Sequence, residues 1–189
     1  MKKIAILFSG SGTNLENLFE KLHLKEFDGL KIEVVATICN NPNAGGIEKS
    51  RRYGIEPTII NHKDFSSREE FDEELVASIK RSGADLVVLA GFMRFLTQVF
   101  TKNVKAINLH PSLLPLFKGG HAIEESYYSS MKVGGITVHF VNEKLDGGAI
   151  ISQKCFQKEK DMSLEEYEKT IHSLEYKLLP KVVVEVLSK

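Results

Sequence analysis

The chain has 189 residues, of which 42% are hydrophobic and 26% charged, and Lys plus Arg equals Asp plus Glu at 25 each. This balance is typical of a folded protein, and the length suits one domain over residues 1–189. The net charge is zero, so the chain lacks the excess of basic residues on which nucleic-acid binding depends. No apolar run reaches the ~20 residues of a membrane span. We therefore predict a cytoplasmic protein without nucleic-acid or membrane partners.

Short apolar runs alternate with helical spacing over the first two thirds of the chain. Buried strands are predicted at 4–8, 32–39, 58–60, 86–90 and 106–109, and helices at 15–22, 47–53 and 71–79. Thr13 or Asn14 is expected to cap the first helix, and Ser67 with Glu70 to form a capping box for the third. The alternation predicts an α/β fold with a mostly parallel, doubly wound, Rossmann-like sheet and helices on both faces.

The pattern changes in the last third. A loop at 111–120 precedes a helix that begins near His121, and two strands at 135–141 and 149–156 are joined by a glycine turn. These are expected to be antiparallel C-terminal strands of the same sheet. Ser163 and Glu166 should cap a final helix, which Pro180 is expected to bend or interrupt.

The loop Ser9-Gly10-Ser11-Gly12-Thr13-Asn14 lies between the first strand and the first helix. Its glycines and the free N–H groups of the helix favour a phosphate site, although a plain strand-to-helix turn also needs glycine. A Walker loop requires a lysine after its glycines, and this loop has none. Leu15 stands where a dinucleotide fingerprint has its third glycine, and Asn40 where it has an acidic residue. A phosphate on a smaller ligand than NAD is the favoured interpretation.

The segment Asn108-Leu109-His110-Pro111-Ser112-Leu113-Leu114-Pro115 follows a predicted strand. Asn108 and His110 are two residues apart, so both side chains point to one face at the strand end, where open α/β sheets bind ligands. An amide and an imidazole directed at one point can stabilise an oxyanion and move a proton, as acyl transfer to an amine requires. A polar pair that only completes the strand end is the structural alternative.

Asp146 lies in the glycine turn between the last two predicted strands. An aspartate there is usually a turn former, but if the turn folds against the fifth strand it would pair with His110 and raise the pKa of that imidazole. His121 and His139 are interpreted as structural or loop-positioning residues. No histidine or cysteine pair has metal-site spacing, so no metal is predicted.

Four segments in order resemble the folate-dependent formyltransferases, and within them the branch that acts on glycinamide ribonucleotide. They are 9–14, 87–94, 108–115 and 135–148, spread over nearly the whole chain. The run Asn-x-His-Pro-Ser-Leu-Leu-Pro and the distal Asp-x-Gly are typical of the wider family, whereas the first loop and Glu175 indicate the ribonucleotide branch. The resemblance implies a single formyltransferase domain over 1–189.

The resemblance also implies the binding residues. Those for the ribonucleotide are Gly12, Thr13, Asn14, His172, Ser173, Leu174 and Glu175, with the first three on its phosphate and Glu175 facing ribose hydroxyls or the amine. Those for 10-formyltetrahydrofolate, the co-substrate, are Arg68, Met93, Arg94, Phe95, Leu96, Asn108, Asn142, Glu143, Lys144, Leu145 and Asp146.

The implied reaction is direct attack of the substrate amine on the formyl carbonyl, a step of purine biosynthesis. Asn108 and protonated His110 would stabilise the oxyanion, and Asp146 would keep His110 charged. A methionyl-tRNA formyltransferase would need a further tRNA-binding domain, and a formyltetrahydrofolate hydrolase a further regulatory one. A non-catalytic nucleotide-binding module would not need the three polar residues together. A monomer or a homodimer is expected.

Overall fold

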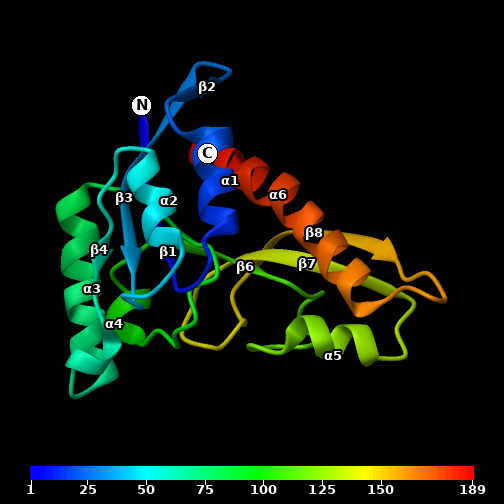
Figure 1. The fold of residues 1–189 in the computed structure, drawn as a ribbon. Coiled ribbons are helices and arrows are strands. Elements are labelled where there is room, and N and C mark those ends of the chain that lie inside the picture. Colours follow the sequence, from blue (N-terminus) through cyan, green and yellow to red (C-terminus); the bar gives the residue numbers. More distant parts are fainter.

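All eight strands belong to one sheet in the computed structural model, which describes residues 1–189 (Figure 1). The strand order is β2-β3-β1-β5-β6-β7-β8, with β4 paired to β3. In chain order the elements are β1 (Lys2–Phe8), α1 (Thr13–Leu22), β2 (Lys25–Phe27), β3 (Leu30–Cys39), α2 (Gly46–Arg52), β4 (Thr58–Ile59), a 3-10 turn (His62–Asp64), α3 (Arg68–Ser82), β5 (Leu86–Leu89), α4 (Gln98–Thr101), β6 (Ala106–His110), α5 (Ala122–Tyr128), β7 (Val133–Phe140), β8 (Ile150–Gln157) and α6 (Leu164–Ser188).

The central strands are buried on both faces because helices cover both. In β1, Ile4, Ile6 and Phe8 pack into a core with α1 and α6. Ala5 and Leu7 alternate with them and pack into a second core with α3. Side chains alternate across a strand, so a strand with a helix layer on each side must be apolar at every position. The predicted doubly wound α/β fold is confirmed.

The parallel part of the sheet has a switch point beside β1. The strand pairs with β3 on one side and with β5 on the other, both in parallel. The loops that follow β1 and β5 therefore leave the sheet in opposite directions. A crevice opens at the carboxyl ends of the strands at such a point, which is where open α/β sheets bind ligands.

The last strands run antiparallel, as predicted. β6 pairs with β7 and β7 with β8, and the β6–β7 register places Asn108 opposite His139 and His110 opposite Thr137. In Figure 1 these strands extend away from the parallel part of the sheet, with α5 and α6 beside them. Two polar residues at the end of β6 thus face a strand that comes about 30 residues later in the chain.

Pro180 was expected to bend or interrupt the final helix, and it does not interrupt it. α6 runs from Leu164 to Ser188, and Pro180 is buried inside it. A proline has no N–H for the carbonyl four residues earlier, which here belongs to Tyr176. The side-chain amide of Asn17, on α1, donates to that carbonyl at 3.0 Å. A neighbouring helix thus supplies the missing hydrogen bond, and α1 and α6 are joined at this point.

Two expected caps differ in detail from the structure. α1 begins after Gly12, which is left-handed at φ 72° and gives no side-chain cap, so neither Thr13 nor Asn14 is the capping residue. Ser67 caps α3 as predicted by accepting from the N–H of Glu70, but the Glu70 carboxylate turns back to Ser66 instead of closing the box on Ser67. The box of Ser163 and Glu166 on α6 is complete.

The short elements β2 and α4 were not predicted. β2 has three residues and pairs antiparallel with the start of β3, and α4 is a single turn of four residues. Elements of this length have too few residues for a hydrophobic period to be recognised.

Candidate active site

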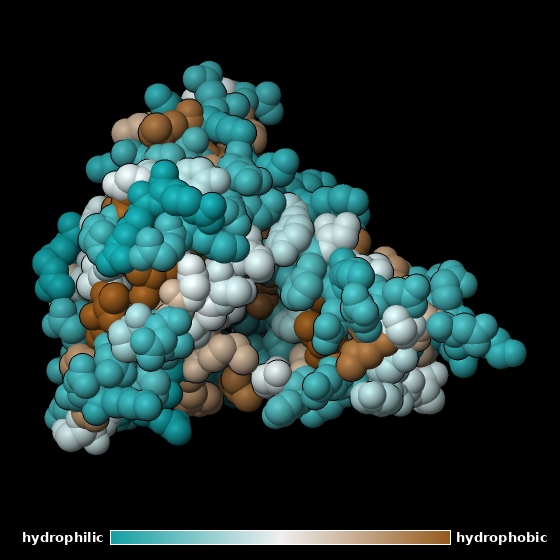
Figure 2. Space-filling view, in the orientation of Figure 1, coloured by the Kyte–Doolittle hydropathy of each residue, from teal (hydrophilic) through white to brown (hydrophobic).

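A cavity of about 540 Å³ opens at the carboxyl ends of β1, β5 and β6. Its walls come from the loop after β1, the loop after β5, the end of β6 with the following loop, the 141–146 turn and one face of α6. Figure 2 shows this face of the molecule hollowed near its middle, with hydrophobic residues gathered beside the hollow. The strand ends thus bring together segments that are far apart in the chain.

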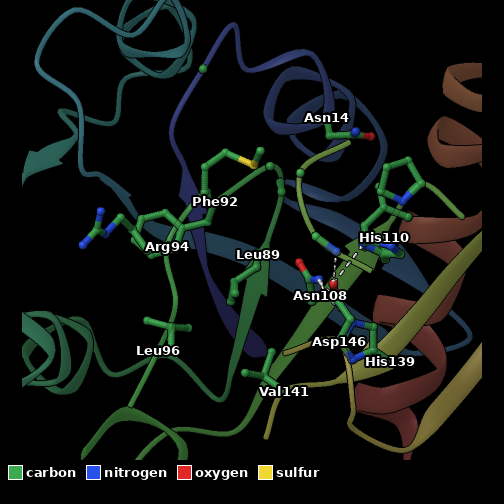
Figure 3. Close-up of a pocket in the computed structure, with 18 of the residues that line it drawn as sticks. Asn14, Leu89, Phe92, Arg94, Leu96, Asn108, His110, His139, Val141 and Asp146 are labelled. Atoms are coloured by element: carbon green, nitrogen blue, oxygen red, sulfur yellow. Dashed lines mark hydrogen bonds and ion pairs between the residues drawn. The ribbon is translucent and has the colours of Figure 1, made fainter. Parts of the chain in front are cut away.

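The three residues predicted to be catalytic meet in this cavity (Figure 3). The Asn108 side-chain amide donates to Asp146 Oδ1 at 3.5 Å, and His110 Nδ1 lies 3.5 Å from Asp146 Oδ2. The other nitrogen of His110, Nε2, donates to the Phe117 carbonyl at 2.7 Å. Both ring nitrogens therefore face oxygen acceptors, and the charged imidazolium, with an N–H on each nitrogen, satisfies both.

Asp146 owes its position to a tight turn. Its backbone is left-handed at φ 47°, a conformation that a short polar side chain tolerates. Gly148 lies so close to the Phe140 carbonyl that an added Cβ would overlap it. Burial disfavours ionisation of Asp146, but the nearby His139 ring, a hydrogen bond from the Gly119 N–H and the charge of His110 outweigh it and lower the pKa of the carboxyl. The turn therefore holds a carboxylate in the site.

His139, interpreted from the sequence as a structural or loop-positioning residue, is a fourth member of the cluster. Its side chain is 3% exposed and its Nε2 lies 3.2 Å from the Asn108 amide nitrogen and 3.7 Å from Asp146 Oδ1. Its Nδ1 donates to the Phe140 carbonyl at 2.8 Å, which fixes the ring orientation. The sequence signal was the alternation along β7, but only the strand register places His139 opposite Asn108.

The glycine loop and α6 form another wall. Gly12, Thr13 and Asn14 line the cavity with His172 and Glu175. Glu175, 4% exposed, accepts at Oε2 from the Asn14 amide at 3.0 Å and from His172 Nδ1 at 2.9 Å. The hydrogen bond to Glu175 is the main cause that raises the pKa of His172, against the opposing effect of burial. The Asn14 Oδ1 atom is buried without a hydrogen-bond partner.

The residues predicted to border a folate divide into two groups. Met93, Arg94, Phe95 and Leu96 line the cavity, as do Asn108, Asn142, Lys144, Leu145 and Asp146. Arg68 does not line it and instead places its guanidinium 5.5 Å from the centre of the Phe95 ring. Glu143 accepts a hydrogen bond from Gln98 outside the cavity.

Ser173 and Leu174 also lie outside the cavity wall, between His172 and Glu175 in the chain. Ser173 is exposed and Leu174 packs against the core. Successive residues of a helix point about 100° apart, so His172 and Glu175, three apart, share a face that the two between them cannot share.

The structure contains no group of three or more His, Cys, Asp or Glu side chains arranged to hold a metal ion. None of its helices has both the length and the apolar character of a membrane span.

A sequence model described as formyl transferase matches residues 2–183. The chain belongs to this family. A phosphoribosylglycinamide formyltransferase of Bacillus subtilis is 34% identical over 189 residues, covering 99% of this chain and 95% of the relative. The trifunctional purine biosynthetic protein adenosine-3 of Drosophila melanogaster is 37% identical over 184 residues, covering 96% of this chain but 14% of that longer protein.

A solved structure agrees with these relatives. The phosphoribosylglycinamide formyltransferase of Campylobacter jejuni subsp. jejuni superposes with a TM-score of 0.96 and 57% identity, over 98% of this chain and 97% of the other. The expected family is confirmed, as is the expectation that the chain is a formyltransferase. The roles of the individual residues stay predictions.

Proposed function

We propose that this chain transfers the formyl group of 10-formyltetrahydrofolate to the amine of glycinamide ribonucleotide, giving formylglycinamide ribonucleotide and tetrahydrofolate in purine biosynthesis. The observation that carries the proposal is the cluster of Asn108, His110 and Asp146 at the centre of a cavity whose two ends differ in chemistry. One end has a glycine loop and a buried carboxylate, and the other has apolar side chains.

The ribonucleotide is assigned to the end formed by the glycine loop. The N–H groups at the start of α1, behind Gly12, favour the phosphate, because a helix N-terminus combines unpaired donors with a positive dipole end. Glu175 and the unpartnered Asn14 Oδ1 offer acceptors to ribose hydroxyls or to the amine. A buried polar atom without a partner is costly, so a hydroxyl or amine of the ligand at Asn14 would remove that cost.

The folate is assigned to the other end. Leu89, Phe92, Leu96 and Val141 lie on one side of Asn108 in Figure 3, opposite His110. Apolar walls with a few polar groups suit a flat, mostly hydrophobic ring system. The backbone of the 141–146 turn adds donors and acceptors for the ring edge. The formyl group is then expected beside the amide of Asn108.

The chemical step needs only proton movement and charge stabilisation. The amine nitrogen bonds to the formyl carbon, and the carbonyl electrons move to oxygen, where Asn108 and protonated His110 stabilise the negative charge. The bond between the formyl carbon and the folate nitrogen then breaks, the folate nitrogen takes up a proton, and the attacking nitrogen loses one. One such oxyanion donor is worth about 3–4 kcal/mol. The Asp146 carboxylate, 3.5 Å from Nδ1, stabilises positive charge on the His110 ring.

Three assays test the substrates. We expect the purified chain to form formylglycinamide ribonucleotide from 10-formyltetrahydrofolate and glycinamide ribonucleotide. Formylation of methionyl-tRNA without activity on glycinamide ribonucleotide would reject the assignment of the acceptor. Hydrolysis of formylfolate without transfer would reject transfer altogether.

Residues 1–189 are further proposed to act as one catalytic domain, either as a monomer or as a homodimer. All the walls of the cavity come from one chain, so each copy would be active by itself. Sedimentation measurements at assay concentrations, compared with specific activity, test this. Specific activity that falls as a dimer dissociates would contradict it.

A further inference from the structure

The loop between β5 and α4 lines the cavity without regular structure of its own. From Phe92 to Leu96, one internal backbone hydrogen bond is formed, from Arg94 N–H to the Phe92 carbonyl at 3.0 Å. Two side chains from elsewhere hold it. Near its start, the Met93 N–H donates to Ser9 Oγ at 2.8 Å. At its end, both the N–H and the hydroxyl of Thr97 donate to Asp72 Oδ2, at 2.6 and 2.7 Å.

Asp72 is an unusual residue for its place in the fold. It lies on α3 with its side chain 0% exposed, beside Phe71, Leu75 and Val76 of the second core. Burial raises the pKa of its carboxyl, and the two hydrogen bonds from Thr97 oppose that effect. A buried carboxylate is destabilising unless it is paired, so a helix needing only stability would carry an apolar residue here.

Two charges act on Asp72, that of Glu69, which raises the pKa of its carboxyl, and that of Arg94, which opposes the rise. The positive charge of Arg94 is among the causes that lower the pKa of Asp72, and its guanidinium lies 5.8 Å from the centre of the Phe71 ring, the residue next to Asp72. Arg94 Nε and Asp72 Oδ1 are both buried and both lack a hydrogen-bond partner. In Figure 3 Arg94 points away from Asn108, His110 and Asp146, whereas Leu96 and Phe92 stay beside the cavity.

We propose that Asp72 is a positioning residue for the formylfolate half of the site, an inference that rests on the proposed function. Its carboxylate fixes the end of the loop through Thr97 and attracts Arg94 towards α3. The two effects keep the apolar side chains of the loop towards the cavity. Asp72 does not line the cavity, so it acts on folate affinity through the loop and not on the chemical step.

The test is steady-state kinetics with each substrate varied in turn. Asp72→Ala is expected to raise the KM for 10-formyltetrahydrofolate about tenfold or more, because two hydrogen bonds to a charged group are lost. The KM for glycinamide ribonucleotide and kcat should change less than about twofold. Asp72→Asn keeps an oxygen acceptor for Thr97 but loses the charge, so its effect on the folate KM should lie between wild type and Asp72→Ala.

Two further comparisons separate positioning from stability. Val76→Ala removes a buried side chain from the same helix and is expected to lower the Tm while leaving both KM values unchanged. Thr97→Ser keeps the hydroxyl that donates to Asp72, whereas Thr97→Val removes it. Only Thr97→Val should raise the folate KM. This pair tests the proposal even where Asp72→Ala fails to fold.

The proposal is overturned if the Asp72 variants or Thr97→Val have a lower Tm but an unchanged KM for 10-formyltetrahydrofolate. It is also overturned if the KM values for both substrates rise equally. Failure of the proposed function is a different result, because wild-type protein would then show no transfer from 10-formyltetrahydrofolate. With an active wild type, the two outcomes cannot be confused.

Discussion

Removing the negative charge of Asp146 is the sharpest perturbation of the site. Asp146→Asn keeps one oxygen that can accept from the Gly119 N–H, so the turn is expected to stay folded. That oxygen, Oδ2, is also the atom 3.5 Å from His110 Nδ1, so the amide nitrogen takes the place of Oδ1, beside Asn108 and His139. His110 then faces a neutral oxygen in place of a charged one, and the Asn108 amide, which donated to Oδ1, meets a second donor.

The magnitude follows from that distance. Two unit charges 3.5 Å apart interact by roughly 5 kcal/mol at an effective dielectric constant of about 20. The lost hydrogen bond from Asn108 adds little, because it is long at 3.5 Å. If His110 must be charged to stabilise the oxyanion, kcat/KM should fall about 10²- to 10⁴-fold, which corresponds to about 3–5 kcal/mol.

A double-mutant cycle on kcat/KM gives the decisive result. His110→Ala should cause a loss similar to that of Asp146→Asn, and the double variant should be far less impaired than the product of the two, since a carboxylate without its imidazole has nothing to stabilise. Asp161→Asn removes an exposed carboxylate elsewhere and is the control, with circular dichroism to check the fold. Strictly multiplicative losses would mean that the two side chains do not cooperate, and the proposed mechanism would be wrong.

Three other predictions concern binding and stability. Gly12→Val should raise the KM for glycinamide ribonucleotide and leave folate binding intact, because Gly12 is left-handed and an added Cβ would lie 2.6 Å from backbone of α2; an unchanged KM would remove the loop from the substrate site. Asn17→Leu should lower the free energy of unfolding by about 1–3 kcal/mol. Adding Pro180→Ala, which restores an N–H, should recover part of that loss in urea titrations, and no recovery would contradict the pairing. The raised pKa of His172 means that its pair with Glu175 stabilises the fold fully below the unfolded pKa of about 6.5 and less as pH rises through the folded pKa. The Tm difference between wild type and His172→Gln should therefore be larger in acid than in alkali, and equal differences would refute this.

Local signals in the sequence were enough for the architecture. Continuous apolar runs such as the one in β1 predict strands buried on both faces, because only a strand between two helix layers is apolar at every position. The spacing of Asn108 and His110 placed both on one face at a strand end, and the structure has both in the cavity wall. These inferences needed only the period of a strand and the position of a residue along it.

Tertiary structure alone decided which distant residues meet. The expected contact of His110 with Asp146 depended on how the 142–148 turn folds. The place of His139 depended on the β6–β7 register, because a shift of one residue would have turned its side chain to the other face of the sheet. The continuity of α6 through Pro180 likewise depended on Asn17, a residue 163 positions earlier in the chain. Only the packing of α1 on α6 brings its side-chain amide to the Tyr176 carbonyl. Propensity and periodicity describe neighbours in sequence, whereas a buried polar group finds its partner by the three-dimensional path of the chain.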